Sequence, residues 1–132
     1  MNSGTFIEVA ADCPVVRAEV PPARGGRATK AAIEYALIAG GPYTLTEAEL
    51  AFRTRVAMRG IPETDWAAER ERVLSEEKPR LRVSALDKRY GWGIHIDTQG
   101  RVALVPVESA EYQRLAADPA LRHLRAFRSR RV

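Results

Sequence analysis

The stretch RYGWGIHIDTQGRVALVPV, residues 89–107, decides the fold because its apolar residues alternate with period two on both sides of a turn signal. Residues 97–100 (DTQG) are typical of a three-residue hairpin loop, in which a type I turn is closed by a left-handed glycine. Such a loop fixes which residues face each other across the hairpin. The expected pairs are Asp97 with Arg101, Ile96 with Val102, Ile94 with Leu104 and Trp92 with Pro106.

The two faces of this hairpin differ in character. One is apolar and is expected in the core, with Trp92, Ile94, Ile96, Val102 and Leu104. The other carries Gly91, Gly93, His95 and Asp97 beside Arg101, Ala103 and Val105. Because two of these positions have no side chain, we expect a shallow groove there with an imidazole at its end.

The segment before the hairpin also alternates, so residues 81–86 are expected to form a third strand of a meander. Its polar side would place Arg80, Arg82 and Ser84 near His95, and arginine binds carboxylate or phosphate through two parallel hydrogen bonds. The pattern therefore predicts an anion site, with a solvated sheet face as the alternative. Its expected ligand-binding residues are Arg82, Ser84, Arg89, Tyr90, Gly91, Gly93 and His95.

The rest of the chain supplies a first strand and several helices. Strands are expected at residues 5–10 and 15–20, and helices at 28–39, 46–59, 65–77, 109–117 and 119–128. Gly40 is expected as a left-handed cap, Thr46 and Glu49 form a capping box, and Gly60 ends that helix. The 65–77 helix is expected to bury Trp66, Val73 and Leu74. The sum is a single α+β domain over residues 1–132, in which an antiparallel sheet is packed with about five helices.

Composition limits the compartment and the partners. One cysteine allows no intrachain disulfide, and residues 1–4 lack the basic start and apolar stretch of a signal peptide, so we expect a cytoplasmic protein. The apolar run of residues 31–39 is interrupted by Glu34 and is too short to span a membrane, so no membrane partner is expected. Residues 80–132 carry 11 Lys/Arg and 5 Asp/Glu, a balance of +6, which attracts anions or an acidic protein.

An enzyme is the first alternative to a binding module. Cys13 would be the nucleophile and His95 its base, provided that the fold brings them together. A lone cysteine is more often a small buried hydrophobe, and a histidine in a strand is more often structural. No metal or cofactor is expected, because one cysteine and two widely separated histidines offer no zinc-type spacing and no phosphate-cradling loop occurs.

Nucleic-acid binding is the second alternative and is not favoured. Three helices before a hairpin suggest a winged helix, but residues 63–78 hold three cations and six anions, and this balance of −3 repels phosphates. If nucleic acid binds, the expected surface is the last helix and tail, with Arg122, Arg125, Arg128, Arg130 and Arg131.

Several motifs along the chain match a known pattern. They are residues 5–7 (TFI), 12–14 (DCP), 42–44 (PYT), 81–84 (LRVS), 88–95 (KRYGWGIH) and 125–131 (RAFRSRR). On these motifs the chain resembles a family of small bacterial proteins known only as a domain of unknown function. The family often has a cysteine just before the Leu-Arg motif, where this chain has Arg80, which weakens a two-thiol redox scheme. The resemblance implies the extent of the domain and no activity. The leading hypothesis is a non-enzymatic module that binds a small anionic ligand or an acidic partner.

Overall fold

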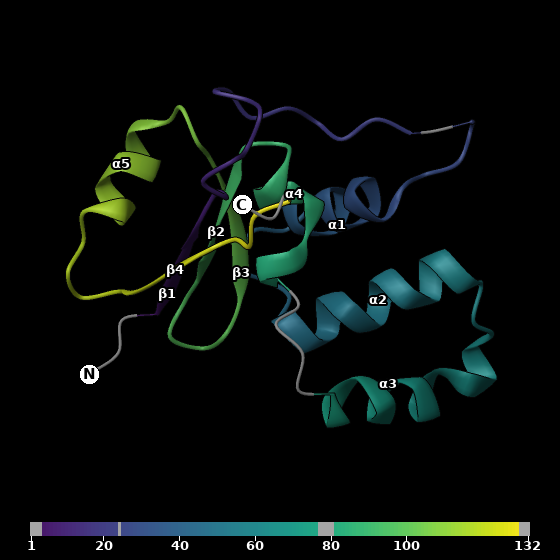
Figure 1. Ribbon diagram of the computed structural model, residues 1–132. Helices are drawn as coiled ribbons and strands as arrows, with labels where there is room; N and C mark the ends of the chain where they lie inside the picture. Colours follow the sequence, from purple (N-terminus) through teal and green to yellow (C-terminus); the bar gives the residue numbers. More distant parts are fainter. Residues whose placement is uncertain (1–3, 24, 77–80, 130–132) are drawn as a thin grey trace.

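The chain folds around one four-stranded sheet with the strand order β3-β2-β1-β4 (Figure 1). The structure, a computed structural model, describes residues 4–23, 25–76 and 81–129. β2 pairs antiparallel with β1 and β3, whereas β4 runs parallel to β1. The α+β class is therefore confirmed, but the sheet is mixed and not purely antiparallel. The strands are β1 (Thr5–Glu8), β2 (Trp92–Ile96), β3 (Val102–Pro106) and β4 (Arg122–Arg125).

The central hairpin, β2 with β3, has the register that the sequence predicts. Ile96 pairs with Val102, Ile94 with Leu104 and Trp92 with Pro106. Its turn is closed by a hydrogen bond from the Gly100 N–H to the Asp97 carbonyl, 3.0 Å, and Gly100 has φ +80°. The Asp97 carboxylate accepts from the backbone N–H groups of Gln99 and Arg101. These local bonds, and not an ion pair with the Arg101 side chain, hold the turn.

The helices begin and end mostly where their capping residues place them. The Thr46 hydroxyl accepts from the Glu49 N–H at the start of α2, and Gly60 ends α2 with φ +62°. Gly40 ends α1 with φ −70°, so the left-handed cap expected there is wrong. The helices are α1 (Lys30–Ala39), α2 (Glu47–Arg59), α3 (Trp66–Ser75), α4 (Ala85–Lys88) and α5 (Ala110–Ala116), with short 3₁₀ turns η1 (Glu63–Asp65) and η2 (Leu81–Val83).

The strand expected over residues 81–86 is wrong. The Ser84 hydroxyl accepts from the Leu86 N–H and starts α4, so the chain makes two short helical turns there. Each turn buries one leucine, Leu81 and Leu86, whereas Val83, which the alternation placed on the core side, is 47% exposed.

Three further expectations differ from the structure. The helix over residues 119–128 is wrong, because the edge of β1 offers backbone partners and residues 122–125 form β4. Residues 15–20 form no strand and instead run beside Gly91. Leu74 is 62% exposed, whereas Val73 on the same helix is fully buried. Apart from the adjoining turn η1, α3 packs on α2 among the larger contacts of the described residues, so it has only one side to bury.

The sheet separates two layers of helices, as Figure 1 shows. On one side, named here the helix face, α1 and α4 cover Ile7, Ile94 and Val102. On the other side, named the α5 face, α5 covers Phe6 and Val105. α2 packs on α1 and α3 on α2, so this helical layer extends away from the sheet. Among the described residues no helix is both long and apolar enough to cross a bilayer.

Candidate functional site: a buried acid pair and the cavity beside it

The open groove expected at Gly91 and Gly93 is wrong. A Cβ on Gly93 would lie 2.7 Å from Tyr112 Cε2 and 3.0 Å from Phe6 Cζ. Gly91 has φ +80°, and a Cβ there would lie 2.9 Å from Val15 Cγ2. Both glycines therefore make room for other parts of the protein, Gly93 for α5 and Gly91 for the loop after β1. A ligand role for either glycine stays a prediction without a groove to support it.

The expected grouping of Arg82, Ser84 and His95 is also not formed. His95 pairs with Phe6 and Ala103 on the α5 face of the sheet. Ser84 lies on the helix face, where it is buried. The Arg82 Nε donates to the Arg125 carbonyl, 2.7 Å, and its guanidinium stacks on Phe127. The sheet thus stands between His95 and Ser84, because 81–84 is not a neighbouring strand. Arg80 lies outside the described residues.

Arg89 and Tyr90 point to different surroundings. Arg89 is exposed and lines a hollow with Asp12, Pro14 and Ser129. Tyr90 is half-buried against the core of the helix face. Their ligand roles remain predictions.

Cys13 and His95 have separate partners. The Cys13 thiol lies 3.9 Å from the Val15 carbonyl, to which it donates. His95 Nδ1 lies 2.7 Å from the Tyr43 hydroxyl. Burial lowers the pKa of His95 and raises that of Tyr43, so both are neutral at pH 7 and the phenol donates to Nδ1. No contact between described residues joins the thiol to the imidazole.

Tyr43 reaches His95 from a strained backbone. Its φ is +57°, the left-handed region that non-glycine residues adopt at a cost of about 1–2 kcal/mol. The Tyr43 N–H donates to the Val102 carbonyl, which fixes the loop against the edge of β3. His95 Nε2 is buried and has no hydrogen-bond partner in the described part of the chain. Tyr43 and His95 are 52 residues apart in the sequence, so no local pattern predicts their contact.

The most unusual groups lie on the helix face, where two carboxyls are buried. Asp87 of α4 is 0% exposed, and neither of its side-chain oxygens has a hydrogen-bond partner among the described residues. Burial, together with the nearby Glu34 charge, raises the pKa of Asp87 to about 8. Asp87 therefore holds a proton at neutral pH. We name Glu34 and Asp87 the acid pair.

Glu34 of α1 is the better satisfied member of the acid pair. The Ser84 hydroxyl donates to Glu34 Oε1, 3.0 Å, and accepts in turn from Leu86. Burial raises the pKa of Glu34, while the Ser84 bond and the Lys30 charge lower it in part. Since Oε1 accepts from serine, a proton on this carboxyl sits on Oε2. In the structure the Ser84 hydroxyl bonds Glu34, and the predicted ligand role of Ser84 stays a prediction.

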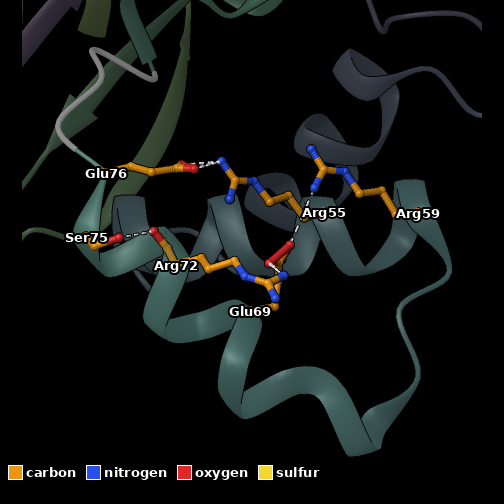
Figure 2. A network of polar contacts seen from close by, with 6 residues as sticks. All are labelled: Arg55, Arg59, Glu69, Arg72, Ser75 and Glu76. Atoms are coloured by element: carbon orange, nitrogen blue, oxygen red, sulfur yellow. Dashed lines mark hydrogen bonds and ion pairs between the residues drawn. The ribbon is translucent and has the colours of Figure 1, made fainter.

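Glu34 also lines a cavity of about 190 Å³ between α1, α2 and η2, named here the acid cavity. It is smaller than the ~300–1,000 Å³ of drug-sized sites and so fits a ligand of few atoms. Arg55 enters it from α2 and forms an ion pair with Glu76, which follows α3 (Figure 2). The lining residues are Lys30, Glu34, Ala51, Thr54, Arg55, Glu76 and Val83.

Two neighbouring hollows involve groups that already satisfy one another. Between α2 and α3, Arg59 and Arg72 both pair with the buried carboxylate of Glu69, as Figure 2 shows. Asp65 lines the same hollow and balances the remaining charge. The apolar cleft beside Phe52 and Trp66 has Glu49, Arg53 and Arg70 at its rim, which are paired together. Within the described residues no cluster of three or more His, Cys, Asp or Glu could hold a metal ion.

Comparison with known proteins places the chain in a family. A model described as a family of unknown function, DUF6157, matches residues 1–132. The chain belongs to this family. No curated protein and no solved structure matches it. The expected resemblance to a family of unknown function is thereby confirmed, and membership fixes the extent of the match without supplying an activity.

Sequence reasoning missed the acid pair for a physical reason. Glu34 interrupts an otherwise apolar helix, and that was its only visible signal. Asp87 lies between Leu86 and Lys88 with no local pattern to mark it as buried. Its burial arises from α4 packing against α1 and β2, contacts between segments far apart in the sequence.

Proposed function

We propose that the protein is a binding module for a small anionic ligand and that the ligand's carboxylate enters the acid cavity. The observation that carries the proposal is Glu34, a buried carboxyl with a raised pKa that opens onto a cavity beside two cations. Groups with such shifts in a concave site are typical of functional sites.

The donors of the cavity favour an oxyanion. Lys30 is exposed and makes no ion pair with the described residues, so its ammonium is available to a ligand. The Arg55 guanidinium contributes a planar set of donors suited to a carboxylate. With Glu34 protonated, its Oε2–H is a third donor, and the cavity holds two cations against the one carboxylate of Glu76.

Asp87 interacts electrostatically with Glu34. The Glu34 charge is one cause of the raised pKa of Asp87, so Asp87 keeps its proton when Glu34 is ionised. Protonated Asp87 adds no second negative charge beside Glu34, so an incoming anion meets less repulsion there. A buried carboxyl without a hydrogen-bond partner costs stability, which favours a role for the acid pair beyond packing.

Glu76 is the group that a ligand must displace or share. It holds Arg55 through both carboxylate oxygens, as a ligand carboxylate would. Replacing Glu76 by Gln removes this competing charge and should strengthen binding.

The test measures melting temperature for the wild type with formate, acetate, succinate and inorganic phosphate at pH 6. A ligand present at 100 times its Kd stabilises by about 2.7 kcal/mol, which raises the melting temperature of a domain of this size by about 10 °C. Arg55→Met should remove the rise and Glu76→Gln should enlarge it. Arg53→Met is the matched control, since Arg53 is on the same helix and does not line the cavity.

The pH dependence gives a second arm. Binding should weaken as pH rises through the raised pKa of Glu34, whereas Glu34→Gln keeps a donor and should bind without that pH dependence. No melting shift with any of the four anions, or equal shifts in wild type and Arg55→Met, would overturn the proposal.

A further inference from the structure

The outer edge of β4 has backbone groups that the sheet does not use. The Arg122 N–H donates to the Gly4 carbonyl and the Ala126 N–H to the Glu8 carbonyl, both at 2.9 Å. In a parallel ladder alternate residues face the partner strand, so residues 122, 124 and 126 face β1. His123 and Arg125 therefore direct their backbone groups away from the sheet.

Only one end of this edge is covered. The Arg125 carbonyl accepts from Arg82 Nε, and the Phe127 N–H donates to the Arg82 carbonyl. The His123 N–H, the His123 carbonyl and the Arg125 N–H have no protein partner among the described residues. An exposed row of this kind is a template for an added strand.

The side chains along the edge are basic. Arg122, His123 and Arg125 are all exposed, and only Arg125 has an ion pair, with Glu8 at 3.6 Å, in the described part of the chain. On the helix face, β4 borders a hollow of about 290 Å³. Its floor includes Ile7, Ile96 and Leu124, and Arg82 and Arg122 also line it. The hollow thus offers a largely apolar pocket, lined by two arginines and one acid, Glu47, beside a row of backbone donors and acceptors.

We propose that the β4 edge takes an extended acidic segment of a partner protein as a fifth strand. Main-chain bonds to His123 and Arg125 hold the segment, and alternate side chains select it. One apolar side chain enters the hollow, and acidic side chains lie beside Arg122 and Arg82. This surface is separate from the acid cavity and does not depend on it.

Charge selects this occupant over a second copy of the chain. Pairing β4 with its own copy would bring Arg122 and Arg125 close to the same two residues of the second copy, and like charges across a strand pair are unfavourable. An acidic strand meets the same residues with opposite charge. Replacing Arg122 by Glu should therefore weaken the binding of an acidic strand, whereas it should strengthen pairing with a second copy.

The experiment uses a synthetic probe peptide of alternating glutamate and valine, and a control peptide with lysine in place of glutamate. Amide exchange and chemical shifts of the full protein are recorded with each. The acidic peptide should protect the His123 and Arg125 amides, and the lysine peptide should not. Fluorescence anisotropy should give at least a tenfold weaker affinity for Arg122→Glu. Arg17→Glu, an exposed change in the loop after β1, is the charge-matched control and should bind as the wild type does.

His123→Pro tests the geometry. Proline removes an N–H that faces outward, so β1 and β4 keep their ladder while the added strand loses a donor. Circular dichroism checks the fold, and the exchange data on the wild type stand without any variant. The proposal is overturned if neither amide is protected at millimolar peptide, or if Arg122→Glu binds as tightly as the wild type. Dimerisation that strengthens in Arg122→Glu overturns it in favour of a second copy.

Discussion

The two faces of the sheet differ in how their buried polar groups are hydrogen-bonded. On the α5 face, the Tyr112 hydroxyl accepts from the Val9 N–H at 3.0 Å, and its ring meets Phe6 edge-on with centroids 5.1 Å apart. On the helix face, Asp87 is fully buried and its carboxyl oxygens have no hydrogen-bond partner among the described residues. Packing accounts for the first arrangement, whereas the second costs stability, since a buried unpaired carboxyl is unfavourable. The α5 face also has a buried unpaired atom, His95 Nε2, but the helix face carries the unpaired carboxyl, which costs more to bury and therefore needs a functional explanation.

The faces also respond to pH with opposite signs. The pKa of Asp87 is raised, so between about pH 4 and 8 the folded state holds a proton that the unfolded state has lost, and stability falls as pH rises. The pKa of His95 is lowered by burial, so below about 6.5 the unfolded state binds a proton that the folded state resists. Its effect is a loss of stability as pH falls.

The largest expected effect comes from Asp87→Asn. The variant removes the titration, so the loss of stability that the wild type shows between pH 5 and pH 8 should largely disappear. With a pKa of about 8 that loss has an upper bound on the order of 5 kcal/mol. Urea unfolding at several pH values measures it. Asp65→Asn, an exposed acid before α3, is the control and should follow the wild type. Parallel curves for Asp87→Asn and wild type would contradict the account.

A smaller effect, about 1–3 kcal/mol of destabilisation, is expected from Gly93→Ala. The added Cβ meets the rings of Tyr112 and Phe6, which have no open space to enter. The same change in a Tyr112→Ala background should cost much less, because the ring that the glycine admits is gone. If Gly93→Ala is neutral in the wild type, the α5 face has a void and the groove expected from the sequence is restored.

The smallest effect is expected from Tyr43→Phe. It removes the bond to His95 Nδ1 and should destabilise by about 0.5–1.5 kcal/mol, measured by thermal unfolding at pH 8. The imidazole should also shift its ¹⁵N resonances, since Nδ1 loses its donor. Unchanged imidazole resonances would show that the contact is absent in solution. Tyr43 does not line the acid cavity, so Tyr43→Phe should bind anions as tightly as the wild type does.

The sequence predicted those features whose causes are local. The turn at residues 97–100 and the cap at Thr46 depend on neighbouring backbone groups, and both are confirmed. The position of β4 could not be predicted in this way, because its partner is β1, more than 100 residues earlier. Residues 119–128 look helical in the sequence, and only pairing with the free edge of β1 makes residues 122–125 a strand instead.

The site was harder to predict than the fold for the same reason. Glu34 and Ser84 are 50 residues apart, and no spacing rule connects them. Glycines beside a histidine drew attention to residues 91–95, but glycine marks close approach by any group. Here that group is the Tyr112 ring of the protein itself.

The central claim is that the helix face keeps a protonated carboxyl at neutral pH. A carboxyl-carbon NMR titration of aspartate- and glutamate-labelled protein, with Asp87→Asn and Glu34→Gln used to assign the signals, tests it most directly. The account predicts that the Asp87 signal titrates near pH 8 and that the midpoint of Glu34 lies above the ordinary glutamate range. Midpoints near pH 4 for both carboxyls would contradict it.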